Sequence, residues 1–171
     1  CWDFAKGEFR WTAAITPEPA LNLALTADGA TVMTAHYGGE MHLWRGADGK
    51  HLDKLEGSAK WPHLTALSPD GTAVARATGA DGAEIVRLGK NTRFALPTER
   101  HPLGLAFTAD GATLRIAEGD GAISSWDARS GKLVGRAVTH DGWPPRLEDE
   151  RHGPKTSARF RTDGLAVALI R

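Results

Sequence analysis

The chain has 171 residues, 41% of them hydrophobic, which is typical of one globular domain with a substantial core and argues against a disordered segment. Lys plus Arg and Asp plus Glu each number 21, and no basic block stands out, so nucleic acid is not an expected partner. The single cysteine, Cys1, excludes an intrachain disulfide and a thiolate zinc site, and no run of 18 apolar residues predicts a membrane-spanning helix. One cysteine fixes no compartment, and the cytoplasm is only slightly favoured.

Residues 1–15 predict the end of a third strand, a turn at Ala5–Gly7, and an outer strand containing Phe9 and Trp11. The following Thr-Pro-Glu-Pro stretch ends this pairing, because proline cannot donate to a strand ladder. Since the chain begins with Cys1 part-way through such a unit and stops inside an apolar run, we expect a fragment of a longer protein.

Three complete units follow, each with short apolar runs separated by turn signals. The first, 20–56, shows period-2 alternation in Leu21, Leu23 and Leu25, which predicts half-buried strands. The second, 62–97, contains Pro-Asp-Gly, and the third, 102–138, contains Ala-Asp-Gly, Gly-Asp-Gly and Arg-Ser-Gly, all turn formers. A polar stretch at 139–155 is predicted to be an inserted loop, and 156–171 to start a further unit.

These units are copies of one repeat. The Asp-Gly pairs that follow the first predicted strand of each unit begin at Asp28, Asp70, Asp110 and Asp163, which are 42, 40 and 53 residues apart. Sixteen residues after the first three pairs come Trp44, Val86 and Trp126, each inside an apolar run. A fixed period near forty residues is the signature of a repeat architecture.

The repeat predicts an all-β fold, with three four-stranded antiparallel sheets and a partial sheet at each end. One such sheet cannot bury both faces alone, so copies must stack face to face. Four antiparallel strands in roughly forty residues match a β-propeller blade, and radial packing leaves only short edges. An isolated piece of such a ring is expected to associate through its exposed blade edges.

The pattern resembles the WD-repeat β-propeller family over essentially the whole chain except 139–155. Trp126-Asp127 is the signature dipeptide at the end of a third strand, and Asp120 precedes it where the family places a structural aspartate. The resemblance implies repeat positions at Trp2, Asp3, Trp44, Asp120, Trp126 and Asp127.

The sequence also departs from the family. Arg45 replaces the aspartate after Trp44, Val86-Arg87 has lost both residues, and no copy is preceded by Gly-His. The full His-Ser-Asp-Trp hydrogen-bond network is therefore not expected. These departures fit a divergent, bacterial-type WD-repeat protein or a related ligand-binding propeller. A slice of a six- to eight-bladed ring is favoured over closure as four blades.

No catalytic constellation is evident, and no cofactor or metal is expected. His36 and His42 flank a Gly-Gly turn, but a zinc site needs three or four convergent ligands, so cross-strand histidines are the simpler interpretation. The acidic run 148–150 is typical of a solvated loop. Gly-rich segments at 46–50 and 130–132 lack the spacing and following helix of a phosphate loop.

The sequence thus favours a non-catalytic interaction scaffold whose partners are proteins. Trp44 and Trp126 are predicted to pack between blades, whereas Trp11, Trp61 and Trp143 fall outside the repeat position. Trp143 with Arg146, in the only inserted loop, is the preferred candidate for partner contact, although Trp143 pinning its own loop is an equal alternative. The competing classes are a ligand- or cofactor-binding propeller and the sensory portion of a signalling enzyme such as a kinase.

Overall fold

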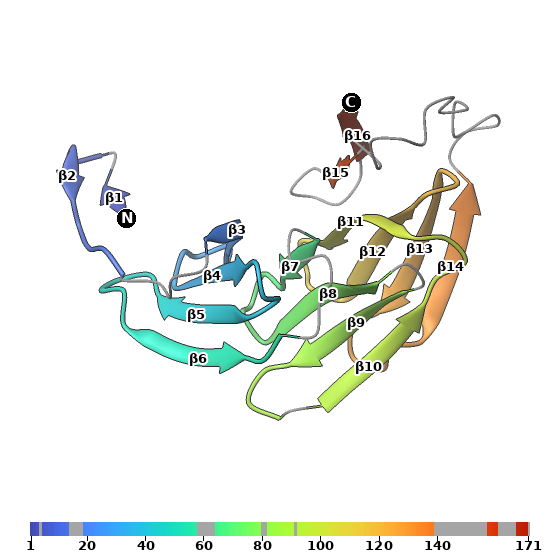
Figure 1. Ribbon diagram of the computed structural model, residues 1–171, viewed down its shortest axis with the longest axis horizontal. Helices are drawn as coiled ribbons and strands as arrows, with labels where there is room; N and C mark the ends of the chain where they lie inside the picture. Colours follow the sequence, from blue (N-terminus) through green and yellow to red (C-terminus); the bar gives the residue numbers. More distant parts are fainter. Residues whose placement is uncertain are drawn as a thin grey trace.

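The computed structural model describes residues 1–3, 5–13, 19–57, 64–79, 82–90 and 92–138, together with the backbone of 157–160 and 167–170. Every regular element in these ranges is a β-strand, and all paired strands are antiparallel (Figure 1). In the described part of the chain, no helix combines the length and apolar character needed to cross a membrane.

Three four-stranded sheets, here called the first, second and third blade, make up most of the structure. The first contains β3 (Ala20–Leu25), β4 (Thr31–His36), β5 (Met41–Arg45) and β6 (His51–Leu55). The second contains β7 (Thr65–Leu67), β8 (Ala73–Gly79), β9 (Gly82–Arg87) and β10 (Thr92–Pro97). The third contains β11 (Pro102–Phe107), β12 (Thr113–Glu118), β13 (Ala122–Asp127) and β14 (Leu133–Val138).

A two-stranded sheet lies at each end of the chain. One pairs β1 (Trp2–Asp3) with β2 (Glu8–Phe9), and the other pairs β15 (Ser157–Phe160) with β16 (Val167–Ile170). The first strands of successive blades, β3, β7 and β11, contact one another, and β11 also contacts β15. The predicted all-β fold of stacked four-stranded meanders is therefore confirmed, with a partial sheet at each end.

The first turn of each blade is the Asp-Gly turn that sets the repeat. Gly29, Gly71 and Gly111 have φ angles of 69°, 68° and 69°, a left-handed conformation that glycine adopts without steric cost. In the first blade, Asp28 Oδ1 accepts hydrogen bonds from the Thr26 hydroxyl (2.7 Å) and the Ala30 amide (2.9 Å). The same hydroxyl-to-aspartate bond joins Ser68 to Asp70 (2.7 Å) and Thr108 to Asp110 (2.6 Å).

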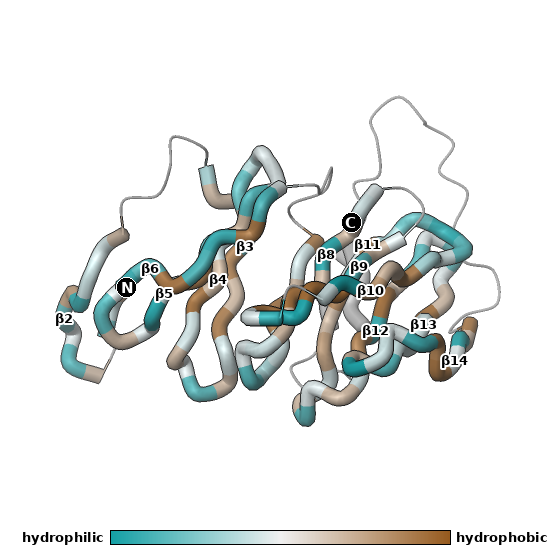
Figure 2. The backbone as a smooth tube through the Cα atoms, turned by 90° about the horizontal axis from the view of Figure 1, so that it is seen from below, coloured by the Kyte–Doolittle hydropathy of each residue, from teal (hydrophilic) through white to brown (hydrophobic). Residues whose placement is uncertain are grey.

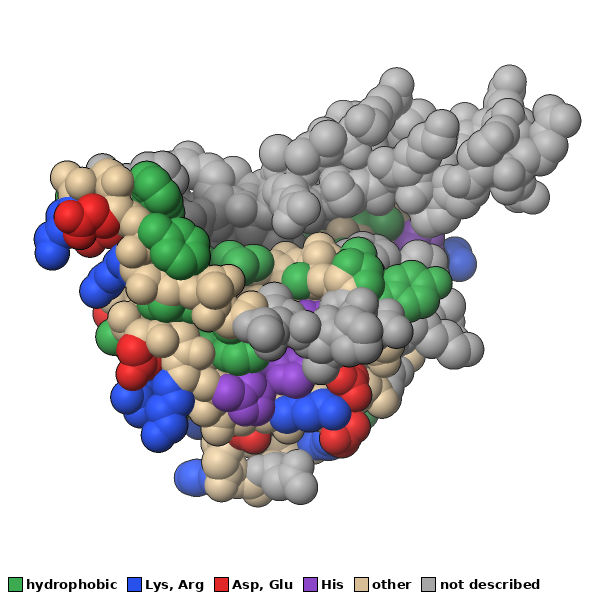
Figure 3. All heavy atoms as spheres, turned by 60° about the vertical axis from the view of Figure 1, so that its left-hand side comes forward, with side chains coloured by type: hydrophobic (Ala, Val, Ile, Leu, Met, Phe, Trp, Pro, Cys, Tyr) green, Lys and Arg blue, Asp and Glu red, His purple; other side chains and the backbone are tan. Residues whose placement is uncertain are grey.

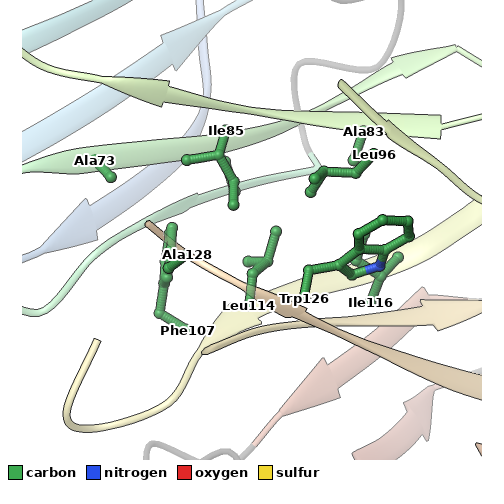
Figure 4. Close-up of a cluster of buried hydrophobic side chains, with 10 residues drawn as sticks. Ala73, Ala83, Ile85, Leu96, Phe107, Leu114, Ile116, Trp126 and Ala128 are labelled. Carbon is green, nitrogen blue, oxygen red and sulfur yellow. The ribbon is translucent and has the colours of Figure 1, made fainter. Parts of the chain in front are cut away.

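The hydrophobic core lies between the blades. Between the first and second blades, Met33, Met41 and Leu43 pack against Val74 and Val86. Between the second and third, the packed side chains are Ala73, Ala75, Ala83, Ile85, Leu96, Phe107, Leu114, Ile116, Trp126 and Ala128 (Figure 4). Outside this core the chain is more polar: the turns along the lower edge of the view in Figure 2 are mostly hydrophilic.

The first blade keeps one apolar strip exposed. Leu21, Leu23 and Leu25 of β3 are 45%, 59% and 56% exposed. Leu23 pairs with Thr34, and side chains alternate between faces, so this strip lies on the face opposite to Met33 and hence opposite to the second blade.

Candidate functional site

Each blade has one face directed toward the sheet that precedes it in the chain, here called its leading face. On the third blade it carries Leu114 and Trp126, which pack against the second blade. On the second blade it carries Val74 and Val86, which pack against the first. On the first blade it is the face opposite to the second blade, and it carries Trp44, which pairs with Val32 in the same register.

The residue at the repeat tryptophan position is buried in all three blades. Trp44 and Trp126 are 7% and 5% exposed, and Val86 is 1% exposed. In Figure 4 the Trp126 ring lies below Leu96 of the second blade, and both side chains belong to the same buried cluster. Trp2, by contrast, lies in β1 and is 51% exposed.

The aspartate after the tryptophan holds the turn that follows. Asp127 Oδ1 accepts hydrogen bonds from the amides of Arg129 (3.2 Å) and Ser130 (2.8 Å) and from the Ser130 hydroxyl. Asp3 Oδ1 likewise accepts from the amides at positions 5 and 6, at 3.1 and 3.2 Å. In the first blade, Asp48 takes this part three residues later, accepting from the Lys50 amide (3.0 Å).

In the first blade the buried Trp44 indole is part of a hydrogen-bonded group. Trp44 Nε1 donates to Thr34 Oγ1 (3.0 Å), and His36 Nε2 is 3.0 Å from the same hydroxyl. All three side chains are buried. Because no copy is preceded by Gly-His, the family's His-Ser-Asp-Trp network was not expected in full. The first blade has an altered form of it, in which the histidine comes from the end of β4.

Two further histidines extend this group across β5 and β6. His42 Nδ1 lies 2.9 Å from His51 Nε2, and the His42 ring stacks on Trp44 with centroids 5.7 Å apart. His36 and His42 meet edge to face, as the Gly-Gly turn between them suggested, with centroids 5.1 Å apart. No three metal-ligating side chains converge on a common point within the ranges that the structure describes.

In the second blade an ion pair occupies the corresponding place. Arg76 is fully buried, and its Nε donates to Glu84 Oε1 at 2.6 Å. Its Nη1 donates to the carbonyl oxygen of Glu56 (2.8 Å), which follows the last strand of the first blade. A charged group is thus buried at the boundary between two blades and is bonded from both of them, while its Nη2 finds no hydrogen-bond partner among the described residues.

In the third blade the predicted structural aspartate, Asp120, belongs to a larger charged group. Arg136 donates to Asp120 Oδ2 and to the buried Glu118 (3.4 Å). Burial acts to raise the pKa of Asp120, but the Ala122 amide and Arg136 outweigh it and lower the pKa. Beside this group, Trp126 Nε1 donates to Ser124 Oγ at 3.0 Å.

A sequence signal for these groups exists in the position two residues before the repeat tryptophan. It is His42, Glu84 and Ser124 in the three blades, polar each time, and it lies on the leading face. The hydrogen-bond partner differs in each blade and could not be read from spacing alone: it is His51 for His42, Arg76 for Glu84 and the Trp126 indole for Ser124.

Trp11 differs from its predicted role. It lies after β2 and not within an outer strand, and its Nε1 donates to the Gly46 carbonyl (2.9 Å). A side chain at Gly49 would collide with the indole, so the ring lies directly on the turn of the first blade. Trp11 therefore joins the segment after the N-terminal sheet to the first blade. Trp61, Trp143 and Arg146 lie outside the described residues.

The polar groups of the leading faces can hold blades together. The hydroxyl, imidazole, guanidinium and carboxylate groups described above bond chiefly to one another. None of these contacts aligns a nucleophile, a base and a group that orients the base.

Comparison with known proteins supports the fold. No protein-family model matches the chain, and no curated protein matches its sequence. Among solved structures, the β-propeller domain of Cps50 (Swd1) from Myceliophteria thermophila matches with a TM-score of 0.75 and 18% identity, over 98% of this chain and 53% of that one. U3-55K matches with a TM-score of 0.59 and 18% identity, over 75% of this chain and 42% of that one. The chain spans about half the length of these structures, and the likeness shows a β-propeller fold.

Proposed function

We propose that the chain is part of a divergent, bacterial-type WD-repeat propeller that acts as a non-catalytic scaffold for protein partners. The propeller fold and the Trp126-Asp127 dipeptide, with Asp120 before it, support this assignment. The proposal includes a division into the end of one blade (1–15), blades at 20–56, 62–97 and 102–138, an inserted loop (139–155) and the start of a further blade (156–171).

The observation that carries the proposal is the distribution of polar and aromatic groups. Inside the blades, polar side chains such as Arg76 and Glu84 are engaged in holding sheets together. At the turn between β4 and β5, in contrast, the Tyr37 side chain is 69% exposed. An exposed aromatic ring on a turn held by a rigid sheet is typical of a protein-contact surface.

The inserted segment starts from the equivalent edge of the third blade. Val138 pairs with Ala122, and Ala122 begins β13 directly after the turn that corresponds to the one carrying Tyr37. Trp143 and Arg146 follow Val138 in sequence. The loop predicted to contain them thus follows a strand, β14, that ends at the rim where partner contact is proposed, and Trp and Arg are enriched among energetically dominant contacts.

The test replaces both proposed contact residues and compares a matched pair elsewhere. Proteins captured by the wild-type chain from an extract of its own organism are identified, and the strongest is purified and titrated. We expect Trp143→Ala/Arg146→Ala to weaken its binding about tenfold or more, an effect of at least about 1.4 kcal/mol. The control Trp2→Ala/Arg10→Ala removes the same residue types from an exposed position at the opposite end of the chain.

Circular dichroism of both double variants separates contact from folding. Equal affinity of the wild type and the Trp143/Arg146 variant would remove these residues from the proposed interface. If the purified protein does not bind and a small cofactor instead raises the Tm of the chain, the ligand-binding class replaces the scaffold proposal.

A further inference from the structure

Three histidines lie on three adjacent strands of the first blade: His36 on β4, His42 on β5 and His51 on β6. His36 and His42 are 0% and 6% exposed, whereas His51 is exposed. Ring centroids are 5.1 Å apart for both His36–His42 and His42–His51. Figure 3 shows histidine side chains at the surface of the face that it draws, between Lys/Arg and Asp/Glu side chains.

The contact between His42 and His51 accommodates only one hydrogen. Their facing nitrogens are 2.9 Å apart, so one ring donates and the other accepts. A first added proton can enter the outer nitrogen of the exposed His51 and leave this bond intact. A second proton, on His42, puts N–H groups on both facing nitrogens, and the hydrogen bond is replaced by repulsion between two cations.

From this geometry we infer that the His42–His51 pair is an acid-sensitive latch, whose second protonation separates β5 from β6 and loosens the leading face of the first blade. Trp44 would move with it, because its ring lies 5.7 Å from His42 and 4.9 Å from His51, centroid to centroid. This inference does not depend on the proposed scaffold function.

The charged neighbours of His42 partly oppose one another. Glu40 Oε2 is 3.8 Å from His42 Nε2 and would favour a protonated ring. Lys54 Nζ, however, lies 2.8 Å from the other oxygen of Glu40 and already neutralises this carboxylate. The imidazoles of His36 and His51 disfavour a further positive charge. Within the described ranges, buried His42 Nε2 has no hydrogen-bond partner to compensate for desolvation.

The direction of the pH effect follows from these contacts. Burial lowers the pKa of His42 below its ordinary value of 6.5, and His36 and His51 lower it further. Because the folded-state pKa is depressed, the folded chain binds fewer protons than the unfolded chain just below pH 6.5. The contribution of neutral His42 to the stability of the fold is thus fully present above that pH and is lost as the pH falls through the folded-state pKa of His42.

The experiment measures the Tm of the 171-residue chain at about pH 7.5 and about pH 5.5, a range in which histidine changes charge. We expect the wild-type Tm to fall by about 3–6 °C. His42→Gln/His51→Gln should lose at least half of this decrease. His101→Gln, a variant of an exposed histidine in front of β11, should retain it. An equal decrease in the wild type and the His42/His51 variant would overturn the latch.

A second measurement uses only the wild-type chain and so does not require the variants to fold. The ring protons of its seven histidines are followed by NMR during an acid titration. We expect at least one midpoint clearly below 6.5, accompanied by a shift of the Trp44 indole N–H resonance over the same pH interval. Seven midpoints at or above the ordinary value would refute the inference.

Discussion

Replacement of Trp126 by alanine tests whether the interface between the second and third blades stabilises the fold. The indole is 5% exposed and packs in the cluster formed with the second blade, and its Nε1 donates to Ser124 Oγ at 3.0 Å. Truncation of a buried tryptophan removes its transfer free energy and leaves a cavity, which together cost about 3–5 kcal/mol. The variant also loses the hydrogen bond to the Ser124 hydroxyl. Loss of a neutral hydrogen bond costs about 1 kcal/mol, which is small enough to fall within the 3–5 kcal/mol range.

The assay is urea unfolding monitored by far-UV circular dichroism. Free energies of unfolding are compared between variants whose dependence on urea concentration (m-value) is equal. Trp126→Phe, which keeps a large ring but loses the N–H donor, should recover more than half of the loss. Trp2→Ala is the exposed control, since Trp2 is 51% exposed, and is expected to cost less than about 0.5 kcal/mol. If Trp126→Ala is no more destabilising than Trp2→Ala, the packing argument is wrong.

Three further predictions use the same unfolding measurement. Arg76→Met should destabilise by about 3 kcal/mol because it removes the buried partner of Glu84 and leaves that carboxylate with the more exposed Arg93 at 3.5 Å, and adding Glu84→Leu should recover most of this loss; a double variant as unstable as the single one would contradict the pairing. Gly131→Ala should cost about 1 kcal/mol or more beyond Gly89→Ala, since both have positive φ but only at Gly131 would a methyl group meet a neighbouring ring; equal costs would refute this. The Ser68 hydroxyl lowers the pKa of Asp70, so the ionised Asp70 stabilises the fold above the ordinary pKa of 3.8, and this contribution is lost as the pH falls below that value. Asp70→Asn should therefore reduce the decrease in the free energy of unfolding between about pH 5 and 3. An unchanged pH dependence would contradict this prediction.

The turns and the repeat could be predicted from sequence because their causes are local. An Asp-Gly pair specifies a backbone conformation by itself, and Gly29, Gly71 and Gly111 have φ angles within one degree of one another. The strand order followed from the even spacing of those turns. The outer strand was predicted to contain both Phe9 and Trp11, but β2 ends at Phe9. The Trp11 indole donates to the Gly46 carbonyl, 35 residues away in sequence, a contact that local spacing does not reveal.

The polar groups between blades could not be predicted because they depend on strand register and on which face a residue occupies. Thr34 and His42 are directly opposite across two strands, and neither position is distinctive alone. The search for the family's histidine ahead of each copy missed His36, which reaches the Trp44 network from the end of β4. Glu118, at the corresponding end of β12, bonds to Arg136 instead.

The polar groups on the leading faces differ from blade to blade, and this difference favours one order of the blades in the fold. Repeats of similar length and turn chemistry are prone to misassembly, since one copy can dock in the place of another during folding. Here Arg76 of the second blade donates to the Glu56 carbonyl at the end of the first, and a neighbouring blade whose backbone presented no carbonyl at this point would leave that buried N–H group unpaired. Because the leading faces differ, each blade packs well only against its own neighbour. Exchanging whole repeats within this chain should therefore destabilise the fold far more than their shared strand order suggests.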